Sequence, residues 1–208
     1  MKYLHHIFDI DGTMLDTEKT GVVSLQMAAR DLLGIELDYA AAYRAFGMPS
    51  SEVAAAYGFA DADRFAEVWE VHFQELMYLV QPFPGVEEVL RTIKAAGGHL
   101  GIVTSRSRFE FSYDPFLKAW RDLFDVIVCA EDAPRHKPFP DPALAYMEQA
   151  GARPEECIYL GDTIMDYRCA TGAGCSFTLA DWRRRGLQGI PAETAFSSAE
   201  EMMKILEI

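Results

Sequence analysis

The stretch Phe8-Asp9-Ile10-Asp11-Gly12-Thr13 lies near the start of the chain, at the end of an apolar run that begins at Tyr3. The run is rich in aromatic and β-branched residues, and its length is typical of a buried strand. Gly12 breaks the run, so both acids fall at the carboxyl end of the predicted strand. Open α/β sheets bind their ligands at this end of the strands.

Asp9 and Asp11 are two residues apart, so on an extended strand their side chains would share one face. At about 4 Å and an effective dielectric constant of about 20, two carboxylates repel each other by about 4 kcal/mol. A bound cation or a retained proton relieves that repulsion. A surface turn is the alternative, because Asp-Gly pairs are common in turns. A calcium-binding EF-hand loop is excluded, because no glutamate falls at the required offset and the segment follows a strand.

The composition is that of a globular protein without strong affinity for polyanions. The chain has 208 residues, half of them apolar, which is enough for one large domain or a core with a smaller insert. The formal net charge is −13, so we expect no binding to nucleic acid or to anionic membranes. No stretch approaches the length of a membrane span, and the N-terminus lacks the apolar segment of a signal peptide. The four cysteines form no Cys-x-x-Cys pair, and we expect reduced, mostly buried thiols in a cytoplasmic protein.

Helical spacing dominates residues 16–82. Apolar residues recur there at intervals of three and four, which predicts helices over residues 16–33, 38–46, 50–57 and 61–80. A cluster of proline and glycine at residues 82–85 then breaks the pattern. An all-helical block directly after a single strand predicts an inserted cap domain over residues 16–82, with a core formed by residues 1–15 and 83–208.

From Gly85 onward, helical and strand patterns alternate. Strands are predicted over residues 100–104, 125–130, 157–160 and 175–179, and helices over residues 86–96, 109–120, 141–150, 164–173 and 198–206. Repeated β-α-β units imply a parallel sheet with helices on both faces. We therefore predict an α/β, Rossmann-like parallel sheet sandwiched by helices, with an inserted all-α cap domain.

Polar side chains recur where the predicted strands end. The carboxyl ends of parallel strands meet along one edge of a sheet, so side chains from separate segments gather there. They comprise carboxylates, hydroxyls and one amine: Asp9, Asp11, Thr104, Ser105, Lys137, Asp162 and Asp166. Each has an ordinary structural explanation by itself, such as a helix cap for Asp162 or a solvated loop lysine for Lys137. Their joint placement favours a single site.

This set of residues resembles the haloacid dehalogenase-like hydrolases along nearly the whole chain. Four segments are similar to the four motifs of that family, in the family's order: Asp9-x-Asp11-Gly12-Thr13, Thr104, Lys137, and Gly161-Asp162-Thr163-x-x-Asp166. The helical block resembles the cap that follows the first motif in the branch of phosphoglycolate phosphatases and β-phosphoglucomutase.

The resemblance implies a Mg²⁺-dependent phosphatase that acts on a small phosphorylated metabolite in two steps. Asp9 would attack phosphorus and form an aspartyl phosphate, while Asp11 would protonate the leaving oxygen and then activate water. Mg²⁺ would be held by the Asp9 carboxylate, the Asp11 backbone carbonyl and Asp162. These roles agree with phosphoryl transfer, which needs charge neutralisation and alignment, and with the preference of Mg²⁺ for carboxylates.

The resemblance also implies residues that bind the phosphate group and the remainder of the substrate. Thr104, Ser105 and Lys137 would bind the phosphate oxygens, and Asp166 would orient Lys137 or a metal-bound water. Arg44 is a candidate specificity residue, because it lies beside a break at residues 46–50 that resembles the substrate loop of the cap.

Two features depart from the family pattern on the substrate side. His136 precedes the lysine where the family usually has a small residue, and Ser105-Arg106 follows Thr104 where asparagine is frequent. Arg106 is a candidate contact for a second anionic group of the substrate, with a solvated loop arginine as the alternative.

Other functions compete with a phosphatase. A phosphomutase of the β-phosphoglucomutase type would use the same core residues and return the phosphoryl group to its product. A non-enzymatic phospho-accepting receiver domain also uses acids, a threonine and a lysine, but it is shorter and lacks a helical insert. A dehalogenase needs neither the second acid nor a metal, and no Gly-x-Gly-x-x-Gly of a dinucleotide-binding domain follows the first strand. We expect a monomer or a homodimer.

Overall fold

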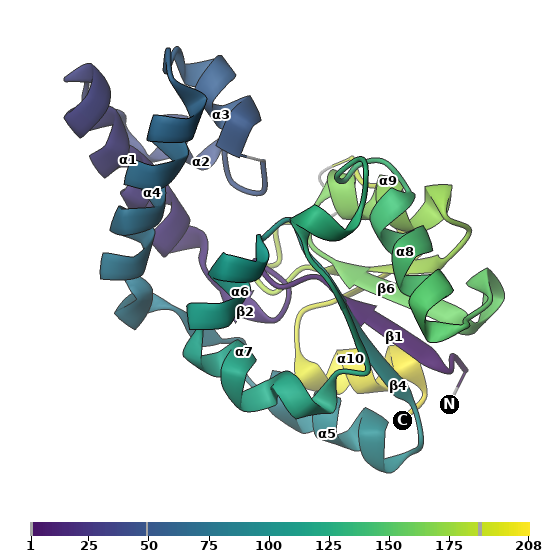
Figure 1. Ribbon diagram of the computed structural model, residues 1–208. Coiled ribbons are helices and arrows are strands. Elements are labelled where there is room, and N and C mark those ends of the chain that lie inside the picture. Colours follow the sequence, from purple (N-terminus) through teal and green to yellow (C-terminus); the bar gives the residue numbers. More distant parts are fainter. Residues whose placement is uncertain (1, 49, 187–188) are drawn as a thin grey trace. The chain divides into compact units, whose positions relative to one another are not determined.

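The computed structural model describes residues 2–48, 50–186 and 189–208, and its chain divides into two compact units (Figure 1). One unit comprises Met1–Leu15 and Pro82–Ile208, and the other comprises Asp16–Gln81. Two short strands, β2 (Leu15–Asp16) and β3 (Gln81–Pro82), pair where the chain passes between the units.

The first unit is built on a six-stranded sheet of order β5-β4-β1-β6-β7-β8, in which every neighbouring pair is parallel. The strands are β1 (His5–Phe8), β4 (His99–Val103), β5 (Val126–Val128), β6 (Cys157–Gly161), β7 (Ser176–Ala180) and β8 (Thr194–Phe196). β1 lies between β4 and β6, with Phe8 level with Ile102 and Leu160. The register brings the carboxyl ends of these three strands together, and the predicted α/β parallel sheet is confirmed.

Helices cover both faces of this sheet, as Figure 1 shows. They are α5 (Val86–Ala95), α6 (Arg108–Tyr113), α7 (Pro115–Trp120), α8 (Asp141–Ala150), α9 (Ile164–Gly172) and α10 (Ala199–Leu206), with short 3₁₀ turns at Arg121–Leu123, Ala130–Asp132 and Pro154–Glu156. α8 and α9 pack on one face over a core that includes Ile7, Tyr146 and Tyr159. α5 and α10 lie on the other face.

In this unit the structure corrects one predicted helix and adds one strand. The single helix predicted over residues 109–120 is two helices, because the Asp114 carboxylate accepts hydrogen bonds from the Phe116 and Leu117 N–H groups and so begins α7 anew at Pro115. The edge strand β8 was not predicted, because its three residues are mostly exposed and show no strand pattern.

Apart from Asp16 and Gln81, which belong to β2 and β3, the regular secondary structure of the second unit is helical in the residues that the structure describes. Its helices are α1 (Glu18–Leu33), α2 (Tyr39–Tyr43), α3 (Ser50–Tyr57) and α4 (Ala62–Glu75), followed by a 3₁₀ turn at Met77–Leu79. An apolar cluster that includes Val22, Leu25 and Phe65 forms their core. Pro49, in the predicted break at residues 46–50, lies outside the described residues.

Two expectations drawn from the composition can be compared with the structure. All four cysteines are free and buried, as predicted. Within the described ranges, no helix combines the length and the apolar character that crossing a membrane requires.

Candidate active site

The loop after β1 is fixed against the neighbouring strand β6. The Asp9 N–H donates a hydrogen bond to the Leu160 carbonyl oxygen at 2.9 Å, which holds Asp9 at the carboxyl end of the sheet. Gly12 has a φ of +79°, and a Cβ atom at this position would lie 2.1 Å from Asp162 Oδ2. Glycine is therefore required both by the left-handed backbone and by the close approach of the loop to Asp162.

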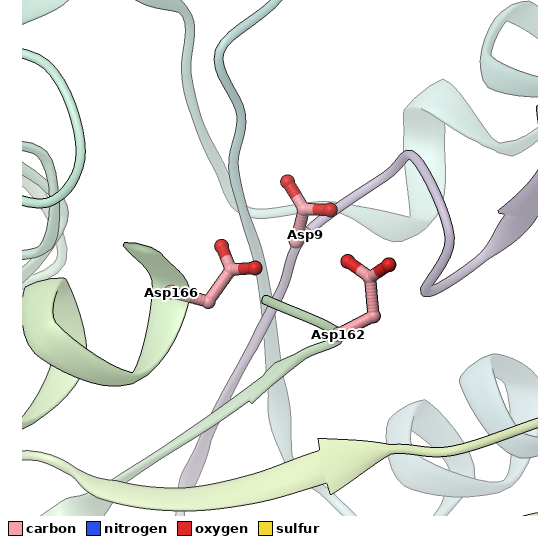
Figure 2. Close-up of side chains that lie close together, drawn as sticks. All are labelled: Asp9, Asp162 and Asp166. Carbon is pink, nitrogen blue, oxygen red and sulfur yellow. The ribbon is translucent and has the colours of Figure 1, made fainter. Parts of the chain in front are cut away.

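Three carboxylates converge at this edge of the sheet, as Figure 2 shows. Asp9 follows β1, Asp162 follows β6, and Asp166 lies in the first turn of α9; each offers an oxygen within 4.8 Å of the other two. The convergence follows from the register of β1 with β6, because Phe8 at the end of β1 is level with Leu160, one residue before β6 ends.

Lys137 joins two of these carboxylates from a loop far away in the sequence. Its Nζ donates to Asp9 Oδ1 and to Asp166 Oδ1, each at 2.7 Å, and the side chain is buried. Burial opposes the charge of Lys137, but Asp166 and Asp9 outweigh that effect and raise its pKa above the ordinary value. The ammonium group therefore stays charged between the two acids.

Asp166 is held in place by its own surroundings. The Thr163 N–H and hydroxyl donate to Asp166 Oδ2 at 3.1 and 2.6 Å, and Thr163 caps α9. The Tyr159 hydroxyl lies 3.1 Å from Asp166 Oδ1 and 3.0 Å from the Val103 carbonyl oxygen. With both oxygens engaged, Asp166 is suited to orienting Lys137.

The remaining two acids of the cluster are electrostatically strained. Burial raises the pKa of Asp9 to about 7, with Lys137 opposing the rise and Asp166 and Asp11 adding to it. Burial, followed by the charges of Asp166 and Asp9, also raises the pKa of Asp162 well above its ordinary value. Asp162 Oδ1 is buried and has no hydrogen-bond partner among the residues that the structure describes. A divalent cation that prefers oxygen ligands, such as Mg²⁺, fits these donors, because it would relieve the repulsion and pair that oxygen.

Asp11 points to a different partner. Arg106 donates from Nε to Asp11 Oδ2 at 2.8 Å and from Nη2 to Asp11 Oδ1 at 2.7 Å. β1 ends at Phe8, so Asp9 and Asp11 lie beyond the regular strand on which their shared face was predicted, and that shared face stays a prediction. The two acids have separate cationic partners.

Arg106 itself corrects one expectation from the sequence. Its side chain is only 6% exposed, so the interpretation as a solvated loop arginine is wrong. Besides the pair with Asp11, its Nη1 donates to the fully buried Asp114 at 3.0 Å. The guanidinium is thus committed to two carboxylates of the protein, and a contact with the substrate stays a prediction.

The other predicted residues lie as follows. Thr104 is buried directly after β4, and its Oγ1 accepts a hydrogen bond from the Arg106 N–H at 3.1 Å. Ser105 is exposed in the same loop, and His136 is exposed beside Lys137. Arg44 is an exposed residue at the end of α2, in the helical unit, so its proposed role is untested.

Sequence reasoning missed Tyr159 and Asp114. Tyr159 lies inside β6 and reads as an ordinary core aromatic, so no local signal marks its contact with Asp166. The pair Asp114-Pro115 is a recognisable helix start, but nothing local indicates that the same carboxylate binds Arg106.

Comparisons with known proteins place this fold and site in a class. A model of the haloacid dehalogenase-like hydrolases matches residues 6–180, and the chain belongs to that family. The resemblance drawn from the four motifs is thereby confirmed, as is the prediction of a hydrolase.

The individual proteins that this chain resembles share less than a third of its residues. A phosphoglycolate phosphatase of Xylella fastidiosa is 29% identical over 195 residues, covering 89% of this chain and 83% of that protein. The pyrophosphatase PpaX of Bacillus velezensis is 26% identical over 203 residues, covering 97% and 94%. A crystal structure of a Lactobacillus plantarum protein, described as a candidate phosphoglycolate phosphatase, has a TM-score of 0.90 at 24% identity and covers 99% of this chain and 100% of that one. The structural match shows the same fold.

Proposed function

We propose that this protein is a Mg²⁺-dependent phosphatase that hydrolyses a small phosphorylated metabolite through an aspartyl-phosphate intermediate. The observation that carries the proposal is the cluster of Asp9, Asp162 and Asp166. A buried lysine, Lys137, binds two of these acids, and Asp162 Oδ1 has no hydrogen-bond partner within the described part of the chain. The relatives named phosphoglycolate phosphatase and pyrophosphatase support a substrate that contains phosphate.

Asp9 is the nucleophile in this proposal. The hydrogen bond from its N–H to Leu160 and the ion pair with Lys137 fix both its backbone and its carboxylate. In the first step a carboxylate oxygen of Asp9 bonds to phosphorus while the bond from phosphorus to the leaving oxygen breaks. Fixing the attacking atom in this way removes most of the entropic cost of the encounter.

Lys137 and Thr104 bind the non-bridging oxygens of the phosphoryl group, and Ser105 completes this set from the same loop as Thr104. Asp9, Asp162 and the Asp11 backbone carbonyl would hold Mg²⁺, which when bound supplies positive charge to the phosphate oxygens. Asp166 keeps Lys137 oriented through their 2.7 Å contact.

Asp11 moves the protons. In the first step its carboxyl group gives a proton to the leaving oxygen. In the second step its carboxylate takes a proton from the attacking water, whose oxygen bonds to phosphorus as the bond to Asp9 breaks. The cycle therefore restores both acids and releases inorganic phosphate.

The helical unit, residues 16–81 in the structure, serves as the cap that selects the substrate. Arg44 is the candidate residue for contact with the leaving group. The leaving group would contact this unit and not the core. Assaying Arg44 variants with a set of phosphorylated metabolites therefore tests whether Arg44 contributes to substrate specificity.

The proposal is tested with p-nitrophenyl phosphate, in Mg²⁺ and in EDTA. We expect many turnovers in Mg²⁺, loss of activity in EDTA, and a fall of at least about 10³-fold for Asp9→Asn with an unchanged circular dichroism spectrum. Asp122→Asn, at an exposed site in the Arg121–Leu123 turn, is the matched control. Near-normal turnover in Asp9→Asn would disprove the nucleophile. A single stoichiometric labelling would instead indicate a receiver, and transfer of phosphate between sugar hydroxyls a mutase.

A further inference from the structure

One arginine contacts two of the groups proposed for catalysis. The Arg106 N–H donates to Thr104 Oγ1 at 3.1 Å, and its guanidinium binds both oxygens of Asp11 at 2.7 and 2.8 Å. Two parallel hydrogen bonds to a carboxylate fix its plane as well as its distance, which a lysine cannot do. The orientation of the Asp11 carboxylate therefore depends on where the guanidinium stands.

Asp114 determines that position. Its Oδ1 accepts the Phe116 and Leu117 N–H groups at the start of α7, at 2.9 and 3.2 Å, while its Oδ2 accepts Arg106 Nη1 at 3.0 Å. The Asp114 side chain is fully buried, and that of Arg106 is nearly so. The break between α6 and α7 thus serves to hold a carboxylate against the far side of the guanidinium.

We propose that Arg106 is a positioning residue: anchored on Asp114, it fixes the place and plane of the Asp11 carboxyl group for proton transfer with the leaving oxygen. This inference rests on the proposed function, because it takes Asp11 as the group that moves protons. It differs from a role in binding substrate, because the guanidinium already contacts two carboxylates of the protein.

The test compares two aryl phosphates that differ only in the nitro group of the leaving phenol. The leaving oxygen of p-nitrophenyl phosphate needs little protonation, whereas that of phenyl phosphate needs more, and kcat/KM reports phosphoryl transfer to Asp9 for both. A misplaced Asp11 therefore slows phenyl phosphate more than p-nitrophenyl phosphate.

Three variants separate positioning from folding. Arg106→Lys keeps the charge and loses the two-point contact, and the double variant Arg106→Gln with Asp114→Asn removes both buried charges together. Asp114→Asn alone keeps the cap of α7, since asparagine is a good capping residue. It weakens only the ion pair that holds Arg106 in place. Arg108→Lys is the control, because Arg108 is exposed and pairs with Asp132 instead of Asp11. Thermal unfolding confirms that each variant is folded at the assay temperature.

We expect the ratio of kcat/KM for p-nitrophenyl phosphate over phenyl phosphate to rise at least about tenfold in Arg106→Lys and in the double variant, within the range that one proton donor contributes. Asp114→Asn should raise the ratio by a smaller factor, and Arg108→Lys should leave it unchanged.

Equal losses on both substrates would overturn the inference and indicate a structural role. A lower ratio would also overturn it, because Arg106 would then hold Asp11 back from the substrate. If the wild-type protein hydrolyses neither ester, the proposed function fails as well; if it hydrolyses both and the ratio does not move, only the inference about Arg106 fails.

Discussion

Replacing Asp9, the proposed nucleophile, by asparagine should stabilise the metal-free protein, and the gain should grow with pH. Asp9 is buried beside Asp166 and close to Asp162, and among the described residues Lys137 is the one cation that pairs with it. Burial raises the pKa of Asp9 from 3.8 to about 7, so the folded protein holds a proton there that the unfolded chain releases. Asparagine has nearly the same shape and never ionises.

The sign and size follow from proton linkage. A carboxyl group whose pKa is raised by folding contributes stability that is complete below pH 3.8 and is lost as pH rises through 7. The full difference corresponds to about 4 kcal/mol of free energy of unfolding. Between pH 5.5 and pH 8, about 2 kcal/mol of it is lost. The variant also loses the ion pair with Lys137, which changes its free energy of unfolding by an amount unrelated to the Asp9 proton. The test therefore uses how the difference in stability between variant and wild type changes with pH, and not its value at one pH.

Urea unfolding in EDTA, followed by circular dichroism at pH 5.5 and pH 8, measures this effect. The free energy of unfolding of Asp9→Asn minus that of the wild type should increase by about 2 kcal/mol between the two pH values. Exposed Asp122→Asn should show no such increase. Saturating Mg²⁺ should reduce the pH dependence of the wild type, because a bound cation favours the ionised carboxylate. A difference that stays constant with pH, or falls, would refute the assignment of strain to Asp9.

The remaining predictions concern Gly12 and the buried His6. Gly12→Ala should weaken Mg²⁺ binding at least about tenfold by titration calorimetry, because its Cβ would lie 2.1 Å from Asp162 Oδ2. Gly97→Ala is the control, since Gly97 has a φ of +82° but no atom within 4 Å of the added carbon; equal losses of affinity would contradict the steric explanation. Burial lowers the pKa of His6 to about 4, so the neutral imidazole contributes stability that is present above pH 6.5 and is lost as pH falls towards 4. His6→Leu should therefore gain about 2 kcal/mol of stability over the wild type between pH 7.5 and pH 5, measured by urea unfolding at these two pH values, and a gap that does not change would count against this assignment.

The sequence predicts those parts of the fold that local periodicity determines. The helices at Ser50–Tyr57 and Asp141–Ala150 begin and end in the structure where the pattern of apolar residues places them. β8 escapes prediction because tertiary pairing with β7, and not its own pattern, makes it a strand. The start of α7 depends on Asp114, whose local role as a cap competes with the longer helical pattern.

For the site, likewise, the sequence predicts which residues converge but not which contacts they form. Because parallel strands end at a common edge, the sequence predicts that Asp9, Lys137 and Asp162 converge. It does not predict which cation pairs with which acid, since Lys137 and Asp9 are 128 positions apart and their contact depends on the packing of two loops. Arg106 illustrates the limit: its neighbours in sequence suggest a solvated loop, whereas the fold buries it.

Each buried cation of the site contacts two carboxylates, and in each case one of them belongs to the first motif. Lys137 pairs with Asp9 and Arg106 with Asp11, so the proposed nucleophile and the proposed proton donor are positioned by separate ion pairs. Asp162 forms no ion pair in the part of the chain that the structure describes, although it lies against the same loop. A phosphate group entering this edge would add negative charge to an existing excess of carboxylates. The cation that the proposed reaction requires would neutralise this excess of negative charge, and Asp162 Oδ1 could serve as one of its ligands. Because Asp9 and Asp11 belong to separate ion pairs, substitutions can alter their proposed roles independently.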